Sequence, residues 1–295
     1  MVACMKKWIF VFSLAGFLVN VGFAQLPQRL VYHSEIEKGA LSTFLKSDSY
    51  NKLTLQLMSD PLVDQQELKV FQRDIHNYVE LLKAKRHKMP SDKAFYGYVF
   101  YKTHHKLLKR YKKYSEFSTL LRTGVYNCLS ATTLYALLYD ALGVDIEIIE
   151  TNHHIYLQLN TLNETFLVES TDPINGFIEN EEEIEAKLKP SFQQRGEDQL
   201  FKFSFDLNER IGLDKLAGLQ YYNKAVHAFN KGEIIAAIEL MEKASVFYNN
   251  KRLREFGILL GKVLIADQSI ESSIRSHYLE RIGATTRVQF IIASI

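Results

Sequence analysis

The strand-like patterns of this chain are confined to the section between Gly124 and Pro173, and helical patterns flank that section on both sides. Three short runs within it, VDIEIIE, HHIYLQL and TFLVES, are rich in the β-branched and aromatic residues that favour strands. The polar NTLNE between the last two runs predicts a hairpin whose turn spans residues 160–163. One small antiparallel sheet among helices predicts an α+β fold.

Helices are predicted on the N-terminal side of the sheet. Up to about Lys88, apolar residues recur at helical spacing, namely Leu68, Phe71, Ile75, Tyr78, Val79 and Leu82. After a break at MPSD, a second helix is predicted from Lys93 to Tyr114. Its many basic residues are interpreted as a solvated face rather than a site for an anionic partner, because acidic residues balance them over the whole chain. His104 and His105 are adjacent and would point in different directions, which makes them a poor metal-binding pair.

The first segment has the tripartite pattern of a secretory signal peptide. Lys6 and Lys7 precede an apolar run from Trp8 to Val19, and cleavage is expected after Ala24. A membrane anchor is the alternative, but Asn20 interrupts a run that is shorter than the roughly 20 apolar residues of a spanning helix. We therefore expect an exported protein, periplasmic or secreted, with no stable membrane span after cleavage.

The C-terminal part, from about Leu216, is again predicted to be helical. Its small residues fall at the offsets where a tetratricopeptide repeat packs its two helices closely, and they are Ala225, Gly232, Ala237 and Ala244. This segment resembles one such repeat, and the helical sequence that follows is interpreted as a degenerate repeat or a capping helix. The expected organisation is a signal peptide at residues 1–24, a domain containing the sheet at 25–205 and a helical, repeat-like domain at 206–295.

Signal cleavage would leave a neutral chain with a single cysteine. The formal charge would fall from +2 to 0, because Lys6 and Lys7 are lost and no acidic residue is lost. A neutral balance does not support nucleic-acid binding. Cys4 would leave with the signal peptide, so that Cys128 would remain alone in a compartment where cysteines usually pair. Such a cysteine is a buried apolar residue, an intermolecular disulfide partner or a reactive thiol, and the neighbours of Cys128 favour the reactive thiol.

Cys128 is predicted to begin a helix that runs to Gly143. A helix N-terminus favours the thiolate, which is the nucleophilic form of cysteine. The hairpin offers the other groups that acyl transfer needs, since the predicted register pairs Leu157 with Phe166 and places His154 directly opposite Glu169. His153 would then face the other side of the sheet. Taken alone, His154 and Glu169 would also suit an exposed cross-strand ion pair, so the prediction depends on the combination with Cys128.

The order of these residues resembles the transglutaminase-like superfamily, a circularly rearranged relative of the papain-like cysteine proteases. The resemblance is carried by YNCLSATTLYALLYDALGVDIEI, HHIYLQL and FLVESTDP. It implies that Cys128 is the nucleophile, His154 the general base and Glu169 the residue that orients the base. The third residue of that family is usually Asp, which leaves Asp172 as a competing candidate. The chain also resembles a bacterial branch in which this core is joined to tetratricopeptide repeats.

The resemblance implies a cysteine hydrolase or acyl-transferase that acts on amide or peptide bonds of a protein or peptide substrate. The Cys128 backbone N–H and a second donor, from Asn127 or Tyr126, are expected to hold the oxyanion. No metal or organic cofactor is implied. The alternative is a non-catalytic binding module of the cell envelope, which would use the same fold and bind a protein partner through the C-terminal helices. Thiol redox chemistry is less favoured, because the mature chain has no second cysteine.

Overall fold

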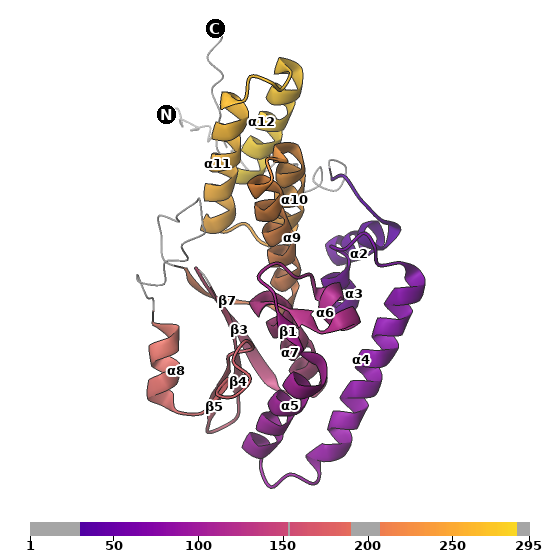
Figure 1. Cartoon of the computed structure of the whole chain (residues 1–295), viewed down its shortest axis with the longest axis vertical. Coiled ribbons are helices and arrows are strands. Elements are labelled where there is room, and N and C mark those ends of the chain that lie inside the picture. Colours follow the sequence, from indigo (N-terminus) through magenta and orange to yellow (C-terminus); the bar gives the residue numbers. More distant parts are fainter. Residues whose placement is uncertain (1–29, 153, 190–206, 288–295) are drawn as a thin grey trace, which may run out of the picture.

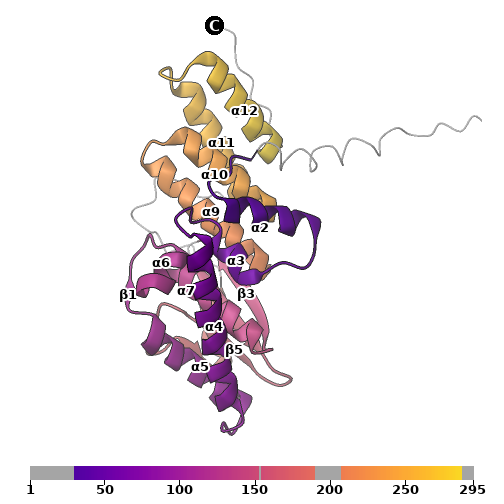
Figure 2. The ribbon, with the colours of Figure 1, turned by 90° about the vertical axis from the view of Figure 1, so that its right-hand side faces the viewer.

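The computed structural model describes residues 30–152, 154–189 and 207–287, so the predicted signal peptide and its cleavage site lie outside the described residues. Within these ranges the protein combines helices with a small antiparallel sheet (Figure 1). An N-terminal group of helices lies beside the sheet, whereas a C-terminal group extends away from it (Figure 2). No helix in this part of the chain has the length and apolar character that crossing a membrane requires.

Between residue 30 and the first strand of the described chain lie the helices α2 (Glu35–Lys46), α3 (Lys52–Leu57), α4 (Gln65–Arg86) and α5 (Asp92–Leu107). Each begins after a residue whose side chain accepts a hydrogen bond from a backbone N–H of the first turn, and these caps are Ser34, Asn51, Asp64 and Ser91. The predicted apolar positions of α4 face inward. Leu68, Phe71, Tyr78, Val79 and Leu82 are buried, and Ile75 is partly buried.

The helix predicted to reach Tyr114 ends at Leu107, which corrects the prediction. The chain then forms β1 (Arg110–Tyr111), which pairs in parallel with β2 (Val125–Tyr126) after the short helix α6 (Phe117–Thr123). The N–H groups of Lys109 and Arg110 donate to the carbonyl of Gly124 at 2.8 and 3.3 Å. Gly124 ends α6 with a φ of 75°, a conformation that favours glycine. This pairing anchors the segment immediately before Cys128.

The main sheet has five antiparallel strands in the order β6–β5–β4–β3–β7. The strands are β3 (Asp145–Thr151), β4 (Ile155–Asn160), β5 (Thr165–Val168), β6 (Phe177–Ile178) and β7 (Asn208–Ile211). One face packs against α7 (Cys128–Ala141), in which every residue from Leu129 to Tyr139 is buried. The other face is covered by Ile184 of α8 (Glu181–Leu188). A helix that is buried on all sides gives its first residue a firmly held position.

The β4–β5 hairpin forms, but its predicted register is wrong by two residues. Leu157 pairs with Val168, and Leu159 pairs with Phe166. The turn closes one residue later than predicted because the Thr161 hydroxyl accepts hydrogen bonds from the N–H groups of the two residues that end the turn, at 3.3 and 2.9 Å. An even shift preserves the alternation of side chains, so Ile155, Leu157, Phe166 and Val168 still share the face toward α7.

The C-terminal helices form two successive hairpins: α9 (Leu213–Asn230) with α10 (Ile234–Phe247), and α11 (Lys251–Ala266) with α12 (Ser272–Thr286). Ala225, Ala237 and Ala244 are fully buried, and Gly232 turns the chain between α9 and α10 with a φ of 80°. Strand β7 lies within the range predicted for the helical domain, yet it pairs with β3. The C-terminal part of the chain therefore completes the edge of the sheet.

A buried ion pair joins the two groups of helices. Lys243 of α10 lies 2.6 Å from a carboxylate oxygen of Glu37 on α2, and both side chains are almost fully buried. The Tyr221 hydroxyl of α9 donates to the same oxygen at 2.7 Å. The attraction within a buried ion pair offsets the cost of desolvating both charges only with good geometry and additional hydrogen bonds. The Tyr221 hydroxyl supplies one of these bonds.

Candidate active site

Cys128 is the first residue of α7 and is partly buried. The preceding residue, Asn127, caps the helix: its side chain accepts from the N–H of Ser130 at 2.8 Å, and the Ser130 hydroxyl accepts from the N–H of Asn127 at 2.9 Å. The N–H groups of Cys128 and Leu129 belong to the first turn, where a helix provides no acceptor of its own. The thiol therefore lies at the positive end of the helix dipole, next to backbone donors that can face an anion.

The side chain of Asn127, expected as a possible oxyanion donor, is used elsewhere. Its amide nitrogen donates to the carbonyls of Lys113 and Ser115 at 3.1 and 3.0 Å. Tyr126, the other expected donor, is buried, and its ring packs edge-on against Tyr111. The backbone N–H groups at the start of α7 are thus the better candidates for holding an oxyanion.

His154 and Glu169 are brought into direct contact. Nε2 of His154 lies 2.6 Å from Oε2 of Glu169, and the two side chains are 19% and 9% exposed. The contact is a short ion pair between two largely buried groups. The expected direct cross-strand opposition is wrong, because the paired residues of β4 and β5 end at Leu157 and Val168. The two side chains meet beyond the ends of the ladder.

The contacts of His154 favour its charged form. Burial by itself would lower the pKa of His154, but the hydrogen bonds and charges of Cys128 and Glu169 outweigh it and raise the pKa to about 9. Burial likewise opposes ionisation of Glu169, yet its interactions with His154 and Thr171 lower the pKa of the carboxyl group. The arrangement stabilises an imidazolium that interacts with both the Glu169 carboxylate and the Cys128 side chain.

The two candidate acids have different surroundings. Oε1 of Glu169 accepts from the N–H and the hydroxyl of Thr171 at 3.0 and 2.6 Å, which leaves Oε2 directed at His154. Asp172 accepts from the N–H groups of Ile174 and Asn175 at 3.0 and 2.9 Å, and so closes its own turn. Glu169, and not Asp172, is therefore the acid in contact with His154.

Three residues that the sequence reasoning did not single out hold the site together. Thr132 Oγ1 and Ser170 Oγ lie 2.9 Å apart, and Ser170 donates to the Cys128 carbonyl at 3.3 Å. The ring of Tyr156 lies 4.6 Å from that of His154. The hydroxyl residues Ser130, Thr132 and Thr133 in a mostly apolar helix are the signal in the sequence that could have indicated a polar contact here. His153 lies outside the described residues.

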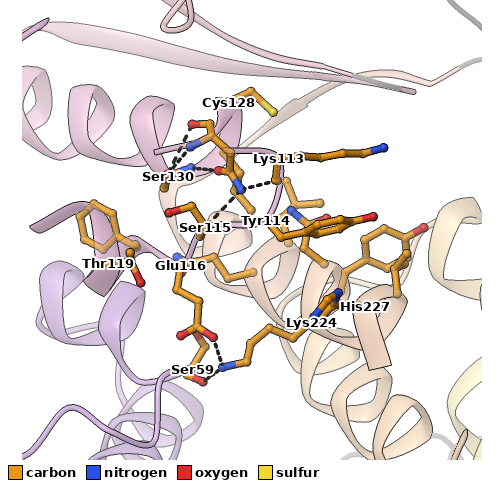
Figure 3. Close-up of a pocket in the computed structure, with 18 of the residues that line it drawn as sticks. Ser59, Lys113, Tyr114, Ser115, Glu116, Thr119, Cys128, Ser130, Lys224 and His227 are labelled. Atoms are coloured by element: carbon orange, nitrogen blue, oxygen red, sulfur yellow. Dashed lines mark hydrogen bonds and ion pairs between the residues drawn. The ribbon is translucent and has the colours of Figure 1, made fainter. Parts of the chain in front are cut away.

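A cavity of about 960 Å³ opens beside Cys128 and His154. Figure 3 shows Cys128 and Ser130 at the start of α7 on one side of it, and Lys224 and His227 of α9 on the other. Lys224 spans the cavity wall, with its ammonium group 2.9 Å from Glu116 and 2.6 Å from the carbonyl of Ser59. The cavity thus has walls from both groups of helices and is large enough for a peptide side chain or a small acyl group.

Within the described ranges, no cluster of three or more His, Cys, Asp or Glu side chains is placed to hold a metal ion. Comparisons with protein families, with curated proteins and with solved structures found no match to this chain.

Proposed function

We propose that this protein is an exported cysteine hydrolase or acyl-transferase with a transglutaminase-like core, acting on amide or peptide bonds through Cys128, His154 and Glu169. The observation that carries the proposal is the short contact between His154 and Glu169 beside a thiol at a helix N-terminus. Cys128 begins α7, His154 immediately precedes β4 and Glu169 immediately follows β5, so the three residues come from separate segments of the chain. Such a convergence is what nucleophilic catalysis by a thiol requires.

In the proposed mechanism, His154 takes the Cys128 proton and remains charged against Glu169. Because Nε2 faces Glu169, Nδ1 is the nitrogen that accepts the proton of the thiol. The thiolate attacks the substrate carbonyl, and the oxyanion is held by N–H groups at the start of α7. His154 then protonates the leaving amine. Water or a second amine attacks the thioester, releases the acyl group and restores the thiol.

The test uses the reactivity of Cys128 and needs no knowledge of the natural substrate. Iodoacetamide should label the folded mature chain once, at Cys128, and at pH 6 about tenfold faster than glutathione. p-Nitrophenyl acetate should release one equivalent of p-nitrophenolate in a burst and leave one acetyl group on Cys128, whereas Cys128→Ser should show no burst. Labelling that occurs only after denaturation would contradict the proposal and would favour the non-catalytic binding module.

A further inference from the structure

Arg252 of α11 reaches out of the helical hairpins to the end of β3. Its Nη2 donates to the carbonyl of Thr151 at 2.7 Å and to that of Asn152 at 3.3 Å. Its Nε lies 3.2 Å from a carboxylate oxygen of Glu150, and its guanidinium group lies 5.4 Å from the centre of the Tyr222 ring. Arg252 is only 8% exposed, so these contacts are made in a buried setting.

The two carbonyls belong to the backbone that carries His154. The N–H and the hydroxyl of Thr151 both donate to the carbonyl of His154 at 2.9 Å, and the N–H of His154 donates back to the Thr151 hydroxyl at 3.0 Å. The side chain of Asn152 is also held, because it accepts a hydrogen bond from the N–H of Leu207 at 2.7 Å. A displacement of Thr151 would therefore be passed directly to His154.

We propose that Arg252 is a positioning residue for His154, so that the C-terminal helices hold part of the catalytic geometry. The inference rests on the proposed function. It adds to the site a residue that is far in the sequence from Cys128, His154 and Glu169. The planar guanidinium group suits the task, because it can donate to adjacent carbonyls while remaining beside Glu150. Lysine at this position would keep the charge but would lose the fixed geometry of the donors. A misplacement of about 1 Å in a catalytic group can lower a rate by roughly a hundredfold.

The experiment compares the wild-type chain with Arg252→Met, Arg252→Lys and the control Arg281→Met. Arg281 is also a buried arginine of the helical hairpins and pairs with Glu242, but it is on α12 and contacts Glu239, Glu242 and Tyr278 rather than the backbone next to His154. The pH dependence of Cys128 alkylation by iodoacetamide is measured for each variant, together with the thermal midpoint and the NMR titration of His154.

Arg252→Met should lower the alkylation rate at pH 6 by about tenfold, while the rates of the two proteins converge above pH 10. Arg252→Lys should lower it by about threefold. Arg281→Met should lose thermal stability and keep the wild-type pH profile. A wild-type profile in folded Arg252→Met would overturn the positioning role. If Arg252→Met does not fold, the pH profile of Arg252→Lys is the test instead. A wild-type profile in Arg252→Lys would then overturn the positioning role.

The wild-type rate tests the proposed function, and the difference between the wild type and the Arg252 variants tests the positioning role. If the wild-type chain alkylates no faster at pH 6 than glutathione, the proposed function fails whatever the variants do. If the wild type is fast and the Arg252 variants are equally fast, only the positioning role fails.

Discussion

The side chains of Thr132 and Ser170 lie 2.9 Å apart in the core and connect α7 to the chain that follows β5. Thr132 also approaches the carbonyl of Ile155 at 3.4 Å, and Ser170 approaches that of Cys128 at 3.3 Å. Through these two hydroxyls the backbones next to the nucleophile, the base and the acid are linked. Both side chains are fully buried, and the hydrogen bond between them is the shortest that either hydroxyl makes.

Ser170→Ala and Thr132→Val should each destabilise the protein by about 1–2 kcal/mol, because each removes a hydrogen bond between two buried hydroxyls. The double variant should lose clearly less than the sum, since both ends of the contact are then removed. Urea unfolding of the three proteins measures this coupling. Thr133→Val is the matched control: its hydroxyl bonds only to the Leu129 carbonyl of its own helix, so its effect should add to that of Ser170→Ala.

Glu169→Gln should lower the alkylation rate of Cys128 at pH 6 by about tenfold or more, because an amide stabilises the imidazolium far less than a carboxylate does. Asp172→Asn should change the rate by less than about twofold, since an asparagine oxygen can still accept from Ile174 and Asn175. Both rates are compared at equal thermal midpoints. A loss of reactivity in Asp172→Asn with none in Glu169→Gln would assign the third position to Asp172.

His154 should titrate with a midpoint near pH 9 in the folded protein, as followed by NMR of labelled histidine. The midpoint should fall in Glu169→Gln and in Cys128→Ala, because both residues raise the pKa of His154. An unchanged midpoint in both variants would mean that neither side chain interacts with the imidazole in solution.

The same shift makes folding depend on pH. The pKa of His154 is higher in the folded chain than its ordinary 6.5, so its stabilising contribution is fully present below pH 6.5 and is lost as the pH rises through about 9. The pKa of Glu169 is lowered, so its contribution is present above the ordinary value of 4.5 and is lost on acidification. The free energy of unfolding of the wild type should therefore fall more between pH 6.5 and 9.5 than that of Glu169→Gln. Parallel pH dependences would contradict the pairing.

Lys243→Met should destabilise the protein by about 3 kcal/mol, because it leaves the Glu37 carboxylate buried without its cation. Adding Glu37→Gln should recover part of the loss, since the uncompensated charge is then removed. Chemical unfolding of the single and double variants tests this contact between α2 and α10. Equal stability of Lys243→Met and the wild type would mean that the pair contributes nothing.

The local pattern of the sequence was sufficient for much of the fold. The strand runs, the helix that begins at Cys128, the inward face of α4 and the small residues of α9 and α10 were predicted correctly, because each depends on a period or a cap that neighbouring residues define. The end of α5 and the register of the hairpin were missed. Both depend on hydrogen bonds to Gly124 and Thr161, and the spacing of apolar residues in the sequence does not indicate such bonds.

By itself, the sequence of this protein indicated which residues could take part in a thiol site: a cysteine at a helix start, a histidine at the beginning of a strand and an acid at the end of the next one. Only the tertiary structure decided that Glu169, and not Asp172, contacts His154, because the choice depends on where Thr171 and the turn at Asp172 direct the two carboxylates. It also brought Arg252 to the backbone beside His154. Contacts between residues so distant in the chain arise from the packing of α11 against the end of β3, and packing is a property of the whole fold.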